Sequence, residues 1–497
     1  MTHKHLVKYH KWEKKDYKEL FKSVNELLNI RSTQFYMPFF SLYFYINNTR
    51  KANMKIDLER NYYLMKIKEI TKERYYNSNM FLIVDLYDSG KNKVEESECF
   101  CKTIPIVDPM HCINNNYNLI QKNNYHLPTA YNYNTFKKIN DMNNTSYIDV
   151  LCSFLFGRLT YHKINPSFPI YYGSLNGIGN YKYDITEEYH EIKLDKCFND
   201  TIEKGFNLEI YISDSDSDNE DSNNEDSDIE SIPRSSLSSY HSSNKSSINK
   251  DDKSSLNYKD DYIAVIKDIP LQLLFIEKLE GTLEDLLDEK VEEEVLLSCI
   301  FQISFALVYL QKYFNFTHND LHINNIMYKQ TETKYLYYKY NNIYYRVPTY
   351  GKIFKIIDFG RAIFTYGNKT FMNDVFSKYG EAGGQYTYHS QVDYMQLNGD
   401  KEIIKPNYHF DLCRLSMTIL EEMDPEKYSD GFSEFLNKMC SNHINESFCT
   451  MRDDFRLYMS IASDACNSLP REIITMEIFN EYRIKKKLFP RKSFYTV

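Results

Sequence analysis

Glycine and proline are scarce in this chain of 497 residues, with 15 and 13 occurrences. Zinc-type C-x₂-C pairs are absent among its 10 cysteines, and Cys99-x-Cys101 is too tightly spaced for a zinc site. The cysteines lie in apolar segments, as at residues 151–154 and 412–413. We therefore expect buried free thiols in an intracellular, reducing compartment rather than a metal or redox site.

The chain also lacks long hydrophobic runs. Its N-terminus is polar and charged, unlike a signal peptide, and no apolar stretch reaches the length of about 18 residues that a membrane-spanning helix needs. We expect no membrane segment. Hydrophobic residues make up 42% of the chain, which is enough for two or three packed units or one large two-lobed enzyme with insertions.

Negative charge is concentrated in one segment. The net charge is -9, and residues 213–261 contain 13 acidic and 5 basic side chains. The remainder is nearly neutral, which argues against nucleic acid or an anionic membrane as a partner. The segment is rich in Ser, Asp and Asn and has few apolar side chains to bury, so we expect a disordered insert there.

The apolar pattern predicts strands early in the chain and helices late. The expected strands are residues 81–87, 100–106, 169–173 and 273–276, the first two joined by a turn at 89–90. The expected helices are residues 146–160 and 292–314. A Tyr-rich stretch at 329–352 predicts a hairpin that turns near 341–342. Its tyrosines either pack within that hairpin, which we favour, or stack on a partner or single-stranded nucleic acid.

Two short motifs carry the chemistry. The sequence HNDLHINN occupies residues 318–325, and a hydrophobic run later ends in Asp358-Phe359-Gly360. Phosphoryl transfer needs a carboxylate to accept the proton of the attacking hydroxyl and oxygen ligands to hold Mg²⁺. Asp320 and Asn325 supply a base and a metal ligand from one loop, and Asp358 supplies a second ligand at a strand end. Each motif alone is weak, but their order and spacing together are specific.

With these motifs the chain resembles the protein-kinase superfamily, and looks most like the divergent serine/threonine kinases of large DNA viruses of the mimivirus type. The resemblance implies ATP and Mg²⁺ as cofactors, a protein substrate, and a location in the host cytoplasm or virion. It assigns Asp320 as catalytic base, places His322 in the catalytic loop, and makes Asn325 and Asp358 the Mg²⁺ ligands. Asp411 resembles the buried acid that braces this loop.

The resemblance also implies an α+β, two-lobed fold with a β-rich N-lobe and a helical C-lobe. We expect an N-terminal extension at residues 1–61, the N-lobe at 62–278 with the insert at 213–261, and the C-lobe at 279–497. Residues 277–279, from Glu277 to Leu279, look like the hinge that binds adenine through its backbone.

A kinase site also needs a lysine on the third strand, paired with an acid on the next helix. The sequence Ala-Val-Ile-Lys ending at Lys267 mimics the familiar motif, but it lies too close to Glu277 to leave room for that helix. We therefore interpret Lys267 as a turn residue. Lys102 precedes the expected helix, which offers Asp149, so we assign Lys102 and Asp149 as the nucleotide-binding pair.

Several departures leave alternatives open. Residues 70–79, where the first two strands meet, contain no glycine, so their amides approach phosphates less closely. Asn319 replaces the usual arginine, His322 stands where serine/threonine kinases have lysine, and no A-P-E motif is present. We expect an ATP-dependent kinase acting on Ser/Thr hydroxyls. The alternatives are a small-molecule phosphotransferase on the same fold and a pseudokinase scaffold.

Overall fold

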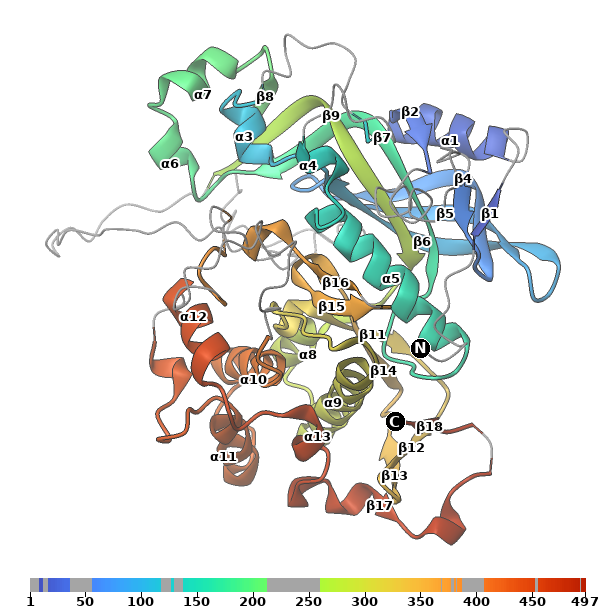
Figure 1. The fold of residues 1–497 in the computed structure, drawn as a ribbon, viewed down its shortest axis with the longest axis vertical. Coiled ribbons are helices and arrows are strands. Elements are labelled where there is room, and N and C mark those ends of the chain that lie inside the picture. The colour runs from blue at the N-terminus through green and yellow to red at the C-terminus, as the bar shows by residue number, and fades with distance from the viewer. Residues whose placement is uncertain are drawn as a thin grey trace, which may run out of the picture.

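The computed structural model has a mixed α+β architecture built from antiparallel sheets and helices (Figure 1). It describes residues 9–11, 17–35, 56–117, 127–128, 137–211, 260–367, 369–376, 380, 382–386, 406–451, 455–491 and 493–497. Within this part the early residues form mainly strands and the late residues form most of the long helices, as the sequence predicted.

One seven-stranded antiparallel sheet dominates the first half, in the order β2-β7-β9-β6-β5-β4 with β8 beside β9. Its strands are β2 (Arg31–Gln34), β4 (Tyr62–Glu73), β5 (Met80–Asp88), β6 (Lys93–Pro105), β7 (Tyr171–Asp184), β8 (Phe206–Tyr211) and β9 (Asp261–Glu277). A separate pair is formed by β1 (Tyr9–Lys11) and β3 (Ile56–Leu58). Short helices attached to this half are α3 (Pro109–Ile113), α4 (Lys137–Asn140), α6 (Tyr189–Ile192) and α7 (Lys196–Thr201).

Two longer helices pack on this sheet. Buried and partly exposed side chains alternate along β5, because successive residues of a strand face opposite sides. Its buried set forms one cluster with Leu20 and Val24 of α1 (Lys18–Leu28). Helix α5 (Thr145–Tyr161) is buried along nearly its whole length and confirms the helix expected at 146–160. Figure 1 shows α5 between the sheet and the helical half of the molecule.

The predicted strands were correct in place but too short. Strand β7 begins at Tyr171 and runs on to Asp184, and the strand expected at 273–276 is only the end of β9. Asp261 and Lys267 therefore belong to β9, and the interpretations of Asp261 as insert and Lys267 as a turn residue were wrong. The backbone does distort beside Lys267, since Asp268 has a φ of 56°.

The described part of the second half contains most of the long helices and three small sheets. Its helices are α8 (Leu283–Asp288), α9 (Glu293–Phe314), α10 (Phe410–Glu422), α11 (Asp430–Met439), α12 (Phe455–Asp464) and α13 (Pro470–Ile473). One sheet has the order β10-β11-β14, from β10 (Gly281–Thr282), β11 (Ile326–Gln330) and β14 (Lys352–Ile356). A hairpin joins β15 (Ile363–Tyr366) to β16 (Lys369–Met372).

Helix α9 confirms the helix expected at 292–314 and forms the centre of the largest hydrophobic cluster. By length and composition alone it is apolar enough to cross a membrane, and it is the single helix of this kind in the described ranges. However, 83% of its most apolar window is buried inside the protein, and the core helix of a soluble protein passes the same test.

The Tyr-rich stretch forms the expected hairpin, with β12 (Tyr335–Tyr340) and β13 (Ile343–Pro348) joined at Asn341-Asn342. Both asparagines have positive φ, 45° and 65°, as a two-residue hairpin turn of this hand requires. The hairpin is extended to four strands by β17 (Arg483–Ile484) and β18 (Tyr495–Thr496). Tyr338 and Tyr345 are fully buried against Phe301, so these two tyrosines serve packing rather than stacking on a ligand.

Other sequence-based expectations are met only in part. The 10 cysteines are free, and seven of them are buried, as expected. Residues 1–61, expected as an extension, contribute α1, which packs on the main sheet, and β2, which pairs with β7 within it. Residues 213–259 of the expected disordered insert lie outside the described residues.

Candidate active site

Lys102 lies at the centre of a cluster drawn from three distant segments. Its Nζ is 2.7 Å from Oδ2 of Asp149 on α5 and 2.8 Å from Oδ1 of Asp358. Lys102 and Phe100 are two residues apart on β6, so their side chains share one face of the sheet. Lys267 is not part of this cluster, and its Nζ donates to the carbonyl of Glu203 at 2.9 Å. The structure thus brings together three residues that the sequence nominated.

The three ionisable side chains of this cluster differ in the direction and cause of their pKa shifts. Burial disfavours the charged form of Lys102, but Asp149 and Asp358 outweigh it and raise the pKa of Lys102. Burial raises the pKa of Asp149. The nearby Lys102 opposes this upward shift, and Asp358 adds to it. Asp358 is 43% exposed, and there Lys102 overcomes desolvation and lowers the pKa of Asp358 below its usual value. At neutral pH, Lys102 is therefore a fixed cation and Asp358 a fixed anion.

The Asp358 turn is set by its backbone and by α5. Strand β14 ends just before it, and Asp358 adopts the left-handed conformation, with φ 59° and ψ 70°. The next amide, of Phe359, donates to Oδ1 of Asp149 at 3.0 Å. The Phe359 ring is buried among other aromatic rings, at 5.2 Å from the Phe156 centroid. Asp149 on α5 therefore contacts both the Asp358 turn and Lys102.

The loop before Asp320 is held by a buried carboxylate from a later helix. Asp411 on α10 is fully buried and accepts from the amides of His318, at 2.9 and 3.1 Å, and Asn319, at 2.9 Å. Burial raises the pKa of Asp411, and these amides oppose that shift. His318 Nε2 lies 2.9 Å from the carbonyl of Ile357, and since a carbonyl only accepts, Nε2 carries the proton. The loop is thereby joined to the residue that precedes Asp358.

Asn325 has a defined amide orientation. Its Nδ2 donates to the carbonyl of Asp320 at 2.8 Å and lies 3.0 Å from Nε2 of His322. His322 must therefore accept, which puts the proton of its neutral ring on Nδ1. Burial lowers the pKa of His322, in keeping with a neutral ring. The backbone carbonyl of Asn325 also accepts from the Ile357 amide at 3.0 Å.

Tyr458 is a site residue that the sequence did not reveal. It is buried on α12, and its hydroxyl donates to Oδ1 of Asp320 at 3.4 Å. The Arg414 guanidinium lies over the Tyr458 ring, 5.4 Å from its centroid. Nothing in the local sequence around Tyr458 connects it to the loop, so no sequence signal could have found it.

The hinge candidates differ in what their groups do. The Glu277 amide donates to the carbonyl of Ile170 at 3.0 Å, and its carboxylate forms a buried ion pair with Lys355 at 2.7 Å. The amide and the carboxylate of Glu277 are therefore both bonded within the protein. Leu279 is buried, and within the described part of the chain its amide makes no backbone hydrogen bond. The sequence offered one signal for this ion pair. Lys355 is a charged residue within an apolar run, so a buried acidic partner was to be expected.

The glycine-free connection between β4 and β5, residues 74–79, closes onto the strand that carries Lys102. The carbonyl of Ser78 accepts from Thr103 Oγ1 at 2.7 Å. The side-chain oxygen of Asn79 accepts from the Thr103 amide at 2.8 Å. Two hydrogen bonds thus fix this loop to Thr103, the residue beside Lys102. A glycine-rich loop would have more conformational freedom here.

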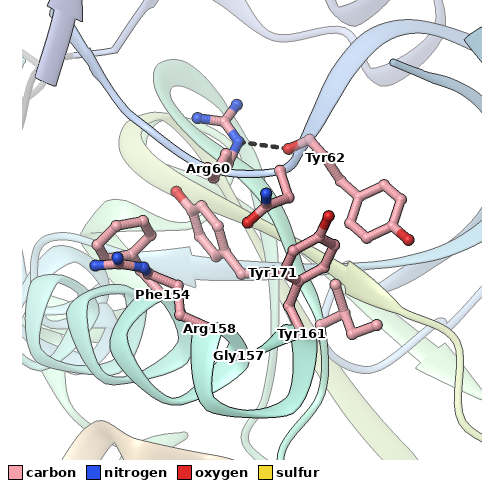
Figure 2. A pocket seen from close by; sticks show the side chains of 9 residues that line it. Arg60, Tyr62, Phe154, Gly157, Arg158, Tyr161 and Tyr171 are labelled. Carbon is pink, nitrogen blue, oxygen red and sulfur yellow. Dashed lines mark hydrogen bonds between the residues drawn. The ribbon is translucent and has the colours of Figure 1, made fainter. Parts of the chain in front are cut away.

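A shallow pocket between α5 and the start of β4 lies apart from this cluster (Figure 2). Arg60 and Tyr171 are among its lining residues, and Arg60 Nε donates to the Tyr62 carbonyl at 2.8 Å. None of the residues nominated from the sequence lines it.

Among the described residues, no group of three or more His, Cys, Asp and Glu side chains is placed to hold a metal ion. A scan against models of known protein families and a search of characterised proteins found no match for this chain.

Proposed function

We propose that this chain is an ATP-dependent protein kinase that transfers the γ-phosphate to Ser or Thr hydroxyls. The observation that carries the proposal is the contact of Lys102 with both Asp149 and Asp358, at 2.7 and 2.8 Å. These three residues come from a strand, a helix and a turn far apart in the sequence. Their convergence is the arrangement required of a strand lysine, a helix acid and a metal-binding aspartate.

The order of the elements supports a two-lobed kinase fold. Strands β4, β5 and β6 pair in sequence, which makes β6 the third strand, and α5 follows it. Strand β9 leads from the main sheet into residues 278–280, after which the helical half begins. We infer that residues 277–279, where β9 leaves the sheet, are the hinge and that the cluster around Lys102 faces the nucleotide between the two halves.

The residues present fit Mg²⁺ and a nucleotide. Asp358 is partly exposed and ionised, and the amide orientation of Asn325 leaves its oxygen for a cation. Mg²⁺ is commonly held by one or two protein oxygens, with phosphates and water completing its shell, so a larger acidic cluster is not needed. When bound, the metal neutralises charge that develops on the phosphates.

In this mechanism Lys102 holds the α- and β-phosphates, and Asp149 keeps its ammonium in place. The carboxylate of Asp320 orients the attacking hydroxyl and accepts its proton as the new P–O bond forms and the bond to the β-phosphate oxygen breaks. The Asn325–His322 contact and the Asp411–amide contacts keep the loop in one conformation. Phosphoryl transfer is catalysed almost entirely by such positioning together with electrostatic stabilisation.

The test is incubation with γ-labelled ATP and Mg²⁺ in the presence of casein, histone, aminoglycosides and choline. We expect label on Ser and Thr of protein substrates, and loss of on the order of 10²-fold or more in Asp320→Asn, as general bases typically contribute. Asp358→Asn should instead weaken Mg²⁺-dependent nucleotide binding, whereas Asp320→Asn should leave that binding intact.

Asp288→Asn is the matched control, because Asp288 is an exposed acid at the end of α8. Label on the small molecules alone would replace the protein-kinase proposal with a small-molecule phosphotransferase. Nucleotide binding without transfer, or no binding at all, would favour a scaffold. Equal rates for wild type and Asp320→Asn would show that Asp320 is not the base.

A further inference from the structure

The Asn373 side chain joins two parts of the candidate site that are far apart in the sequence, the Asp358 turn and the start of α5. Asn373 is fully buried, and its Nδ2 donates to the carbonyl of Gly360. Its Oδ1 accepts from Oγ1 of Thr145 at 3.0 Å and from the amide of Val375 at 2.9 Å. A carbonyl can only accept a hydrogen bond, so the orientation of this amide is determined by its surroundings.

The two groups that Asn373 connects determine where the charges of the site lie. Gly360 lies within the turn that begins at Asp358. Thr145 begins α5, and Asp149 follows it one helical turn later. A shift of α5 relative to the turn would separate Lys102 from one of its two carboxylates. Asn373 therefore resists the motion that would take this cluster apart.

Neighbouring contacts reinforce the link between α5 and the segment around Asn373. The amide of Asp374 donates to the carbonyl of Asn143 at 3.0 Å, just before α5. The Asp374 carboxylate is 3.2 Å from Nζ of Lys138 on α4. These groups are a backbone amide, a carbonyl and unmodified side chains, so this attachment needs no added phosphate.

The catalytic loop is attached to the same segment by neutral groups. Asn319 Nδ2 donates to the carbonyl of Arg361 at 3.0 Å, and its Oδ1 accepts from the Tyr386 hydroxyl. Kinases switched by phosphorylation order this segment through an arginine paired with the new phosphate. Here an asparagine occupies that place and is already bonded to its neighbours.

We propose that Asn373 is a positioning residue that keeps Lys102, Asp149 and Asp358 assembled in the unmodified chain, so that the site requires no activating phosphate. The proposal concerns the regulation of the site and rests on the proposed function. It predicts an enzyme whose rate does not depend on phosphorylation of the segment that follows Asp358.

The first test uses the full chain, treated with a broad-specificity protein phosphatase and checked by intact mass. We expect the transfer rate to stay within about twofold of the untreated chain. A second test compares Asn373→Ala with Thr145→Val, which removes one hydroxyl and keeps the side-chain shape. We expect kcat to fall about tenfold in Asn373→Ala and less in Thr145→Val. The double variant should resemble Asn373→Ala, because neighbours that share one link are not additive.

The decisive readout does not depend on activity. Labelling of Lys102 by an amine-acylating reagent, followed by mass spectrometry, should rise several-fold in Asn373→Ala, because Lys102 loses carboxylate partners. Asn480→Ala, at an exposed asparagine, is the matched control and should label like wild type. Unchanged labelling in both Asn373→Ala and Thr145→Val would overturn the proposal, as would loss of transfer after phosphatase treatment.

The two levels of proposal can fail separately. If the wild type transfers no phosphate, the proposed function fails, while the labelling of Lys102 still decides whether Asn373 holds the cluster together. If Asn373→Ala does not fold, Thr145→Val provides the same comparison. A kcat and labelling level equal to wild type in that variant would then overturn the role of this link.

Discussion

The hydroxyl of Tyr458 lies 3.4 Å from Oδ1 of Asp320, although 138 residues separate the two. Helix α10 explains how they meet. Its Asp411 binds the amides just before Asp320, and its Phe410 packs on the Tyr458 ring at 5.9 Å between centroids. One helix thus positions both the loop and the tyrosine, and Tyr458 contacts one carboxylate oxygen of Asp320.

Tyr458→Phe keeps the buried ring and removes the hydroxyl that contacts Asp320. A hydrogen bond to a charged group contributes about 1.5–3 kcal/mol, and the length of this contact favours the lower end, so kcat should fall about tenfold. The KM for ATP should not change, because in the proposed mechanism Asp320 acts on the hydroxyl substrate and not on the nucleotide. Steady-state kinetics provide the measurement, and Tyr350→Phe, at an exposed tyrosine, is the control. A wild-type kcat in Tyr458→Phe would assign Tyr458 to packing alone.

The two candidate lysines predict opposite outcomes. Lys102→Met removes the cation that both Asp149 and Asp358 contact, so phosphotransfer should fall sharply and the KM for ATP should rise. Lys267→Met removes one exposed contact to the Glu203 carbonyl and should change little. ATP titrations on the two variants measure both effects. The reverse result would mean that the nucleotide lies elsewhere on the sheet.

His322 should make stability depend on mildly acidic pH. Burial lowers the pKa of His322 below its ordinary value of 6.5, so between the lowered value and 6.5 the unfolded chain binds more protons than the folded chain. Stability is then lost as the pH falls through that window. In His322→Gln, an amide oxygen replaces Nε2 as acceptor for Asn325 and does not titrate there.

Thermal unfolding between about pH 7.5 and 5 measures this difference. The Tm of the wild type should fall more steeply than that of His322→Gln. His443→Gln, at an exposed histidine, should retain the wild-type slope. Parallel slopes for wild type and His322→Gln would show that His322 does not lose a proton-sensitive contact on acidification.

Removal of the acidic insert should leave the fold intact. Tyr211, the last residue of β8, pairs with Asp261, the first residue of β9, so a short Gly/Ser turn in place of residues 213–259 can join them. Each halving of a flexible loop removes roughly 0.6 kcal/mol of closure cost, which predicts an equal or slightly higher Tm and unchanged activity. A Tm lower by several degrees would show that the insert contributes to packing.

Much of the candidate site could be predicted because its signals are local. The loop at 318–325 and the turn at 358–360 contain their candidate residues within a few positions. An apolar run identified α5, and helical periodicity identified α9. The choice of Lys102 over Lys267 also followed from the order of elements. Strand lengths were missed because pairing partners set them. Strand β7 continues through Gly177, where an added Cβ would lie 2.1 Å from Ile30, so a residue from a distant segment explains the glycine.

The sequence by itself determined which residue types are available and in what order, since motif spacing and apolar periodicity are properties of neighbouring positions. Only the tertiary structure decided that Lys102 contacts two carboxylates, that Glu277 pairs with Lys355, and that Tyr458 and Asn373 reach the site. These contacts join residues far apart in the chain, and their geometry depends on how the packed cores place whole strands and helices. No local pattern encodes that placement, because it results from the burial of many side chains at once.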